Sequence, residues 1–276
     1  MTSRVFCVIA LALGGTVFLT GAWPGPLARP SENAAATFVA QTISLDPSIV
    51  GDSVNAGELV SKSLATLCPS KVRWLKTQIR QTMQTPQSSF VAEGTLHRGP
   101  QYCARLEMTI GAGTILVVSD GRVAARVRGI PGCQPKTDVD PLPETDAGKR
   151  DSLAGLGCDG PVAMLRKIQP HLVNATLATG MLSDEPVIRV KVTLPDKAQT
   201  PDLLAIGAPR YCQVYLHANT LWPICIEWLT VETNQSTRTS LRVEFLEPSI
   251  NRELDHATCE RLFSYQPAES TVATNP

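Results

Sequence analysis

Hydrophobic and polar positions alternate with two different periods along the chain. Before Pro86 the apolar residues recur every three to four positions, which is typical of one face of a helix. This spacing predicts a first helix over residues 59–67 and a second over residues 72–83. Ser70 is placed to cap the second helix, and Pro86 lies just past its expected end. The first part of the folded region is therefore predicted to be helical.

After Pro86 the period changes to two, which predicts half-buried strands. The strands expected in this part cover residues 90–97, 102–110, 115–118 and 122–129. The last two are joined by Ser119-Asp120-Gly121, a turn sequence. A sheet built from consecutive hairpins is expected here.

A polar stretch over residues 134–159 interrupts the strands and predicts a long loop with at most a short helix around residues 148–156. A helix is expected after Asp159 or Gly160, because Pro161 suits a first helical turn. Further strands are predicted at residues 173–180, 187–194, 210–217, 220–230, 238–246 and 262–266. About ten strands with few helices favour an α+β, mainly β chain, in which helices cover one large antiparallel sheet.

The N-terminal 22 residues have the layout of a secretory signal. Arg4 precedes an apolar run over residues 5–19, and small residues follow. A retained membrane anchor needs roughly 20 apolar residues, so the alternative is that this segment spans the membrane and contacts it through residues 5–22. Residues 23–55 are rich in Pro, Ala and Ser and predict a linker. A folded domain over residues 56–269 and a tail over residues 270–276 complete the expected organisation.

Composition narrows the classes of function. The 25 basic and 25 acidic side chains give no net charge, which argues against nucleic acid as a partner. Seven cysteines remain when Cys7 is set aside, and an exported protein can use them in disulfides. The four histidines are scattered and no cysteines are closely spaced, so neither a metal site nor a cofactor is expected.

The hairpin over residues 210–229 carries the most specific pattern. A turn centred between Ala218 and Asn219 would place Cys212 opposite Cys225, which predicts a disulfide or a close thiol pair. The other face of this hairpin would carry Tyr211, Tyr215, Trp222, Ile224, Ile226 and Trp228. These side chains suit either ordinary core under a helix or the wall of a concavity that holds an acyl chain.

Several short motifs resemble the periplasmic lipoprotein carriers of the LolA/LolB type. Three segments resemble the opening strands of that family: residues 94–100, Arg105-Leu106-Glu107, and residues 115–121, which end in Ser-Asp-Gly. The resemblance continues through the helix after Gly157 and the Leu-x-Pro step at residues 221–223, and then through Val243-Glu244-Phe245, Asn251 and Phe263. It covers roughly residues 57–267.

The resemblance implies a single strongly curved antiparallel sheet, an incomplete barrel closed by helices, whose apolar interior accepts acyl chains. Arg98 matches the arginine that holds the lid helices of the carriers by hydrogen bonds to their backbone, although Gly99 is inserted before Pro100. Val117 falls where the carriers place an interior aliphatic side chain.

The first functional hypothesis is an exported protein, periplasmic or extracytoplasmic, that binds lipid or lipoprotein acyl chains. The expected cavity residues are Leu106, Met108, Val117, Tyr215, Trp222, Ile224 and Trp228. The alternative is a non-transporting envelope sensor or anchored scaffold of the same fold, with an envelope protein as partner. Enzyme activity is not expected, because the sequence has no nucleophile elbow, phosphate loop or clustered Cys and His.

Overall fold

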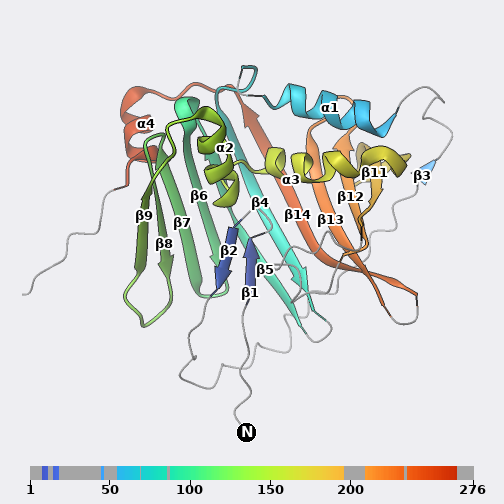
Figure 1. Ribbon diagram of the computed structural model, residues 1–276, viewed down its shortest axis with the longest axis horizontal. Helices are drawn as coiled ribbons and strands as arrows, with labels where there is room; N and C mark the ends of the chain where they lie inside the picture. Colours follow the sequence, from blue (N-terminus) through green and yellow to red (C-terminus); the bar gives the residue numbers. More distant parts are fainter. Residues whose placement is uncertain are drawn as a thin grey trace, which may run out of the picture.

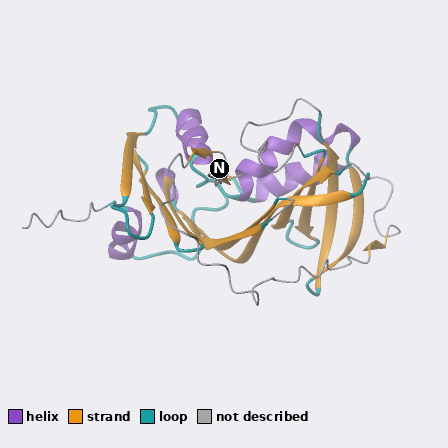
Figure 2. Cartoon of the chain, turned by 90° about the horizontal axis from the view of Figure 1, so that it is seen from below, coloured by secondary structure: helices purple, strands orange, loops and turns teal. Residues whose placement is uncertain are grey.

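A computed structural model describes residues 8–11, 15–18, 45–46, 55–68, 70–85, 88–195, 209–232 and 235–265. Its main feature is a 12-stranded antiparallel sheet with the order β3-β10-β11-β12-β13-β14-β4-β5-β6-β7-β8-β9 (Figure 1). The strands are β3 (Leu45–Asp46), β4 (Leu75–Gln84), β5 (Ser89–Arg98), β6 (Cys103–Ile110), β7 (Gly113–Asp120), β8 (Val123–Gly129), β9 (Lys136–Pro141), β10 (Thr176–Leu182), β11 (Glu185–Thr193), β12 (Tyr211–His217), β13 (Pro223–Val231) and β14 (Thr237–Ile250). The sheet is curved and its two edges do not meet, so the predicted fold class is confirmed (Figure 2).

Helices lie on both sides of this sheet. Three of them, α1 (Ala56–Thr66), α2 (Asp146–Gly155) and α3 (Pro161–Ile168), lie over one face, and α3 continues into a 3-10 helix, Gln169–Asn174 (Figures 1 and 2). We call this the inner face; it carries Leu106, Val117 and Phe245. The opposite, outer face carries Arg105 and Tyr215, and α4 (His256–Phe263) lies against it near β6 and β7.

Two described segments near the N-terminus pair with each other. β1 (Val8–Leu11) and β2 (Gly15–Phe18) form a separate two-stranded antiparallel sheet within the stretch predicted to be a signal or anchor. Among the described residues, no helix combines the length and the apolar character needed to cross a bilayer. The expected linker lies outside the described residues except at β3 and Asn55, and so does the expected tail.

The second predicted helix, over residues 72–83, is wrong, because most of this segment forms the strand β4. Leu75, Ile79 and Met83 are four positions apart, and this spacing fits one face of a helix or of a strand, because four is a multiple of two. In the structure these residues are buried while the alternate residues Lys76 and Arg80 are exposed. Pairing with β5 on one side and β14 on the other gives the segment a central place in the sheet.

Two further segments differ from the prediction. β9 lies inside the stretch predicted to be a loop, because its polar sequence has no apolar alternation, and it is held by pairing with β8. The strand expected at residues 262–266 is wrong, since α4 ends at Phe263. Asp255 caps that helix by accepting a hydrogen bond from the Thr258 amide at 2.8 Å.

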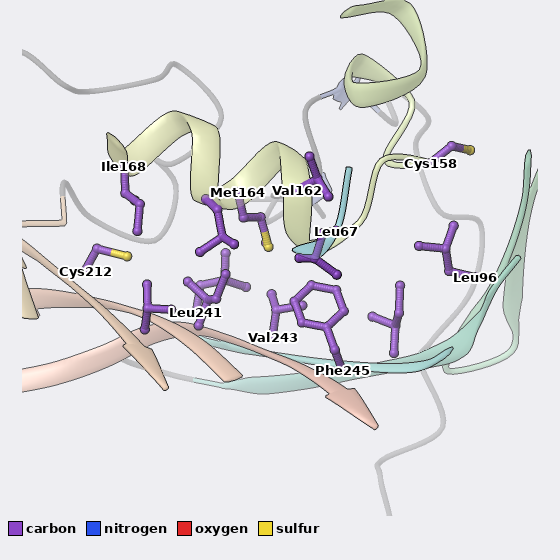
Figure 3. Packing of buried hydrophobic residues seen from close by; sticks show 14 of the residues in the cluster. Leu67, Leu96, Cys158, Val162, Met164, Ile168, Cys212, Leu241, Val243 and Phe245 are labelled. Atoms are coloured by element: carbon purple, nitrogen blue, oxygen red, sulfur yellow. The ribbon is translucent and has the colours of Figure 1, made fainter. Parts of the chain in front are cut away.

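The core lies between the inner face and the helices. Figure 3 shows Val162, Met164 and Ile168 of α3 above Leu241, Val243 and Phe245 of β14, with Leu67 beside them. These side chains are all almost fully buried. The same cluster extends across β5, β6 and β7 through Leu96, Leu106 and Val117, which are also fully buried. Burial of this apolar area is the main stabilising contribution to the fold.

Local sequence explains where the covering helices begin. The side chain of Asn55 accepts a hydrogen bond from the Glu58 amide at 3.1 Å and caps α1. α3 begins with Pro161 directly after Gly160, whose φ of +55° favours glycine. A Cβ at Gly160 would lie 2.5 Å from the Leu96 side chain, so this glycine lets the start of α3 approach β5.

Candidate functional site

The β12–β13 hairpin has a different register from the predicted one. Cys212 lies opposite Trp228, and Tyr215 lies opposite Cys225, so the pairing is shifted by three residues. The turn is longer than expected, because the His217 amide donates to the Trp222 carbonyl at 2.8 Å. Cys212 therefore belongs to the inner face and Cys225 to the outer face. Both are free, and the predicted disulfide or close thiol pair is wrong because their side chains point to opposite sides of the sheet.

Five of the expected cavity residues come together in one buried cluster on the inner face. They are Leu106, Met108, Val117, Trp222 and Trp228. Ile224 is partly buried and packs against the same cluster. The Trp222 indole donates from Nε1 to the Phe245 carbonyl at 3.1 Å, which leaves the ring face available for apolar contact. Tyr215 is the exception, because it lies on the outer face.

Helix side chains occupy the space above part of the inner face. Val60 of α1 and Met164 and Leu165 of α3 are fully buried against it. The 3-10 helix adds Leu172. An apolar ligand that reaches the residues below these helices must therefore displace the side chains of α1 and α3, and the contacts that hold the helices decide how readily this happens.

Arg98, at the end of β5, contacts the segments that bear two of the covering helices, α1 and α3. Its guanidinium donates to the Leu67 carbonyl, at the C-terminal end of α1, at 3.0 Å, and to Asp159 Oδ1, two residues before α3, at 3.3 Å. Asp159 Oδ2 also accepts from Arg166 of α3 at 3.2 Å. A guanidinium at the last carbonyls of a helix satisfies acceptors that have no partner within the helix. We call the contacts of Arg98, Leu67, Asp159 and Arg166 the latch.

Burial governs the electrostatics of the latch. The side chains of Arg98 and Asp159 are only 11% and 12% exposed. Burial lowers the pKa of Arg98, and burial raises the pKa of Asp159 although Arg98 and Arg166 oppose the change. Burial also raises the pKa of the neighbouring Cys158 to about 12, so that thiol stays protonated at neutral pH. Because removing two charges from water offsets much of their attraction, the ion pair fixes geometry more than it adds net stability.

On the outer face, Tyr215 is part of a buried polar network. Its hydroxyl lies 2.7 Å from Gln213 Oε1 and 3.0 Å from Glu227 Oε2. Arg242 donates to Glu227 at 2.7 Å and to Glu244 at 2.8 Å. Burial raises the pKa of Tyr215, and the proximity of the Glu227 carboxylate acts in the same direction. Tyr215 therefore stays a neutral hydrogen-bonding group within this network.

A cavity of about 530 Å³ also lies on the outer face, where α4 meets the ends of β4, β5 and β14. The rings of Trp74 and Phe263 stack along its side with centroids 6.2 Å apart. Lys76 and His97 contribute polar groups, and burial together with Lys76 lowers the pKa of His97. This cavity has a mixed lining, unlike the apolar inner face.

Sequence reasoning missed two sets of charged residues near the inner face. The sequence places Asp159 only near the start of a helix, because nothing in it indicates that Arg98 reaches this side chain. It predicts a strand at Arg126 and Arg128 but does not assign them to a face of the sheet. Both arginines are assigned to the inner face by the pairing of Arg126 with Val117, and this pairing is known only from the register of β7 and β8 in the structure.

No protein-family model matches the chain, and no curated protein matches it. Several solved structures are similar. For LprF from Mycobacterium bovis the identity is 11%, over 72% of this chain and 94% of that chain, with a TM-score of 0.42. A LolA superfamily protein from Nitrosomonas europaea is 10% identical, over 77% of this chain and 99% of that chain, with a TM-score of 0.30. A chain of the MucA/MucB complex of Pseudomonas aeruginosa is 12% identical over 72% of this chain, with a TM-score of 0.39. This match covers 60% of that chain, which is less than two thirds of its length.

Proposed function

We propose that this chain is an exported lipid-binding protein that holds acyl chains between the inner face of its sheet and the helices α1 and α3. The observation that carries the proposal is the latch: one arginine at the end of β5 contacts the segments that bear both helices above a continuous apolar face. A few polar contacts at one end of an apolar cover can break without disturbing the strand pairing of the sheet.

The free energy of exchanging helix side chains for a lipid depends mainly on how much apolar surface each of them buries. An acyl chain gains about 25 cal/mol for each Å² removed from water, and the side chains of α1 and α3 lose comparable burial when they move aside. The closed state without lipid must therefore compete with the loaded state, as a carrier requires for release. Met164 suits this exchange, because an unbranched thioether side chain adapts to different neighbours.

In this proposal the N-terminal segment directs the chain out of the cytosol. Acyl chains of a lipid or lipoprotein are its ligand, and it uses neither a cofactor nor a metal. If residues 5–22 are retained, the protein is anchored to the inner membrane and acts there as a sensor or scaffold rather than as a free carrier. The mass of the mature chain distinguishes these forms.

Lipid binding can be measured directly. Protein purified without detergent should carry acyl species in native mass spectrometry, and delipidated protein should take up a fluorescent fatty acid. Arg98→Leu should release this probe faster than wild type, because the latch no longer opposes helix opening. Arg80→Leu is the matched control, since Arg80 lies in the neighbouring strand and its exposed side chain forms an ion pair with Glu93. Absence of bound lipid together with no uptake of the probe would refute the proposal.

A further inference from the structure

Two arginines interrupt the apolar inner face at β8. Arg126 lies opposite Val117 of β7, and Val117 lies opposite Leu106 of β6. Directly opposite residues of antiparallel strands point to the same side of the sheet, so Arg126 shares the inner face with both. Arg128, two residues further along β8, lies on the same face opposite Ile115. The side chains of Arg126 and Arg128 are only 24% and 13% exposed.

The charges around these arginines do not balance. Asp138 of β9 faces Arg126 in the register, and its Oδ2 accepts from Arg128 and lies 3.6 Å from Arg126 Nη2. One carboxylate therefore serves two guanidinium groups. Lys136 and Asp140 occupy the same face of β9, are exposed, and cancel each other in charge. The cluster keeps one positive charge at the edge of an apolar surface.

Some hydrogen-bond donors of the cluster also lack an acceptor. Within the described part of the chain, the Nε atoms of Arg126 and Arg128 are shielded from solvent and have no hydrogen-bond partner. A buried donor without a partner costs about 1–3 kcal/mol, so these groups favour an acceptor brought by a ligand. The planar guanidinium matches phosphate and carboxylate oxygens, which it can bind through two parallel hydrogen bonds.

We propose that Arg126 and Arg128 bind the anionic headgroup of a lipid whose acyl chain extends across Val117, Leu106 and Leu96. These three residues lie side by side on β7, β6 and β5, so the row from Arg126 to Leu96 extends about 14 Å at the usual strand spacing. The headgroup then lies toward β9, which is one edge of the sheet, and the chain points toward the region under the helices. This inference rests on the proposed function and adds the class of ligand, an anionic amphiphile.

The test compares lipids that share their acyl chains and differ in headgroup. Delipidated protein is titrated with phosphatidylglycerol, phosphatidylcholine and diacylglycerol, and separately with inorganic phosphate. Wild type should bind phosphatidylglycerol roughly tenfold more tightly than diacylglycerol, as expected for one charge-assisted contact. Phosphatidylcholine, which has the same phosphate but also a cationic choline group, should bind with an affinity between the two. Arg126→Gln with Arg128→Gln should abolish this preference while diacylglycerol binding stays unchanged. Arg80→Gln on the outer face should behave as wild type.

A second variant covers the case in which the double substitution does not fold. Asp138→Asn keeps both arginines and removes the carboxylate that competes with the ligand, so it should increase the preference for phosphatidylglycerol. A preference that is unchanged or reduced would overturn the inference.

The remaining outcomes separate this inference from the proposed function. Equal binding of all three lipids by wild type would overturn the headgroup site and leave lipid binding intact. Binding of none of them would refute the proposed function itself. Inorganic phosphate that binds as tightly as phosphatidylglycerol would show a site for a free anion instead of a lipid headgroup.

Discussion

The two faces of β13 are both buried, yet they are built from opposite chemistry. On the inner face, Ile226 and Trp228 belong to the apolar cluster under the helices. On the outer face, Glu227 contacts Tyr215 and Arg242 in a network of directional hydrogen bonds. Apolar contacts are non-directional and tolerate a change of partner, whereas a buried polar network requires fixed geometry. The directional contacts of the outer face therefore fix the strands, whereas the apolar contacts of the inner face tolerate a change of partner.

The largest effect is expected where the inner face is most closely packed. Phe245→Ala removes a side chain that is 1% exposed and should lower the free energy of unfolding by about 3–5 kcal/mol, as for other buried phenylalanines. Urea unfolding followed by circular dichroism measures the change. Ile250→Ala on the same strand is the control; that side chain is 44% exposed, and its loss should cost less than about 0.5 kcal/mol. Equal losses at the two sites would show that the inner face is not a close-packed core.

The latch should affect the helices more than the sheet. Arg98→Leu removes hydrogen bonds made by a charged donor, worth about 1.5–3 kcal/mol, from the ends of α1 and α3. Amide hydrogen exchange in both helices should therefore accelerate by roughly tenfold or more, and exchange in β13 should not change. Arg80→Leu serves again as the control. Faster exchange in the whole sheet would instead assign Arg98 a general structural role.

The outer network should stabilise the protein without affecting ligand exchange. Glu227→Gln replaces a charged acceptor by a neutral one, while Arg242 keeps its contact with Glu244, so the cost should be about 1 kcal/mol of unfolding free energy. The release rate of a bound fluorescent fatty acid should stay at the wild-type value. Glu93→Gln, at an exposed ion pair, is the matched control. A change in release as large as that of Arg98→Leu would remove the distinction between the two faces.

The smallest effect concerns the pH dependence of the latch. Burial raises the pKa of Asp159 in the folded state, so its ionised form costs stability at neutral pH, and this cost disappears as the pH falls through the folded-state pKa. The difference in Tm between wild type and Asp159→Asn should therefore shift in favour of wild type between pH 7 and pH 4.

Asp255→Asn provides a control of opposite sign. Hydrogen bonds from Thr258 lower the pKa of Asp255, so its contribution is present above the ordinary pKa of aspartate and is lost below it. Wild type should keep a constant advantage over this variant between pH 7 and pH 4 and lose it at lower pH. The same trend for both variants would contradict the proposed effect of burial at Asp159.

Sequence periodicity identified most of the sheet because many of its strands bury one face and expose the other. It failed at β4, where a spacing of four residues suits both helix and strand, and at β9, whose single aliphatic side chain, Val139, sets up no alternation. The register of the β12–β13 hairpin depended on the length of its turn, and an error of three residues moved Cys225 to the opposite face from Cys212. Such an error cannot be detected from hydrophobicity, because both faces of β12 are buried.

The candidate site was predicted only in part, because only some of its residues belong to a local pattern in the sequence. Leu106, Val117 and Trp228 follow from apolar alternation, and Arg98 follows from the family resemblance. Asp159 and the pair Arg126 and Arg128 depend on contacts between segments far apart in the sequence, and local patterns do not report such contacts.

The polar character of β9 has a consequence for the behaviour of the protein in solution. A sheet that does not close leaves backbone donors and acceptors on its last strand, and such a strand readily pairs with another polypeptide. β9 is that last strand, and Lys136, Asp138, Asp140 and Pro141 place charges and a residue without an amide proton along it. These residues disfavour edge-to-edge pairing through β9, which is the route by which an exposed strand starts a fibrous assembly.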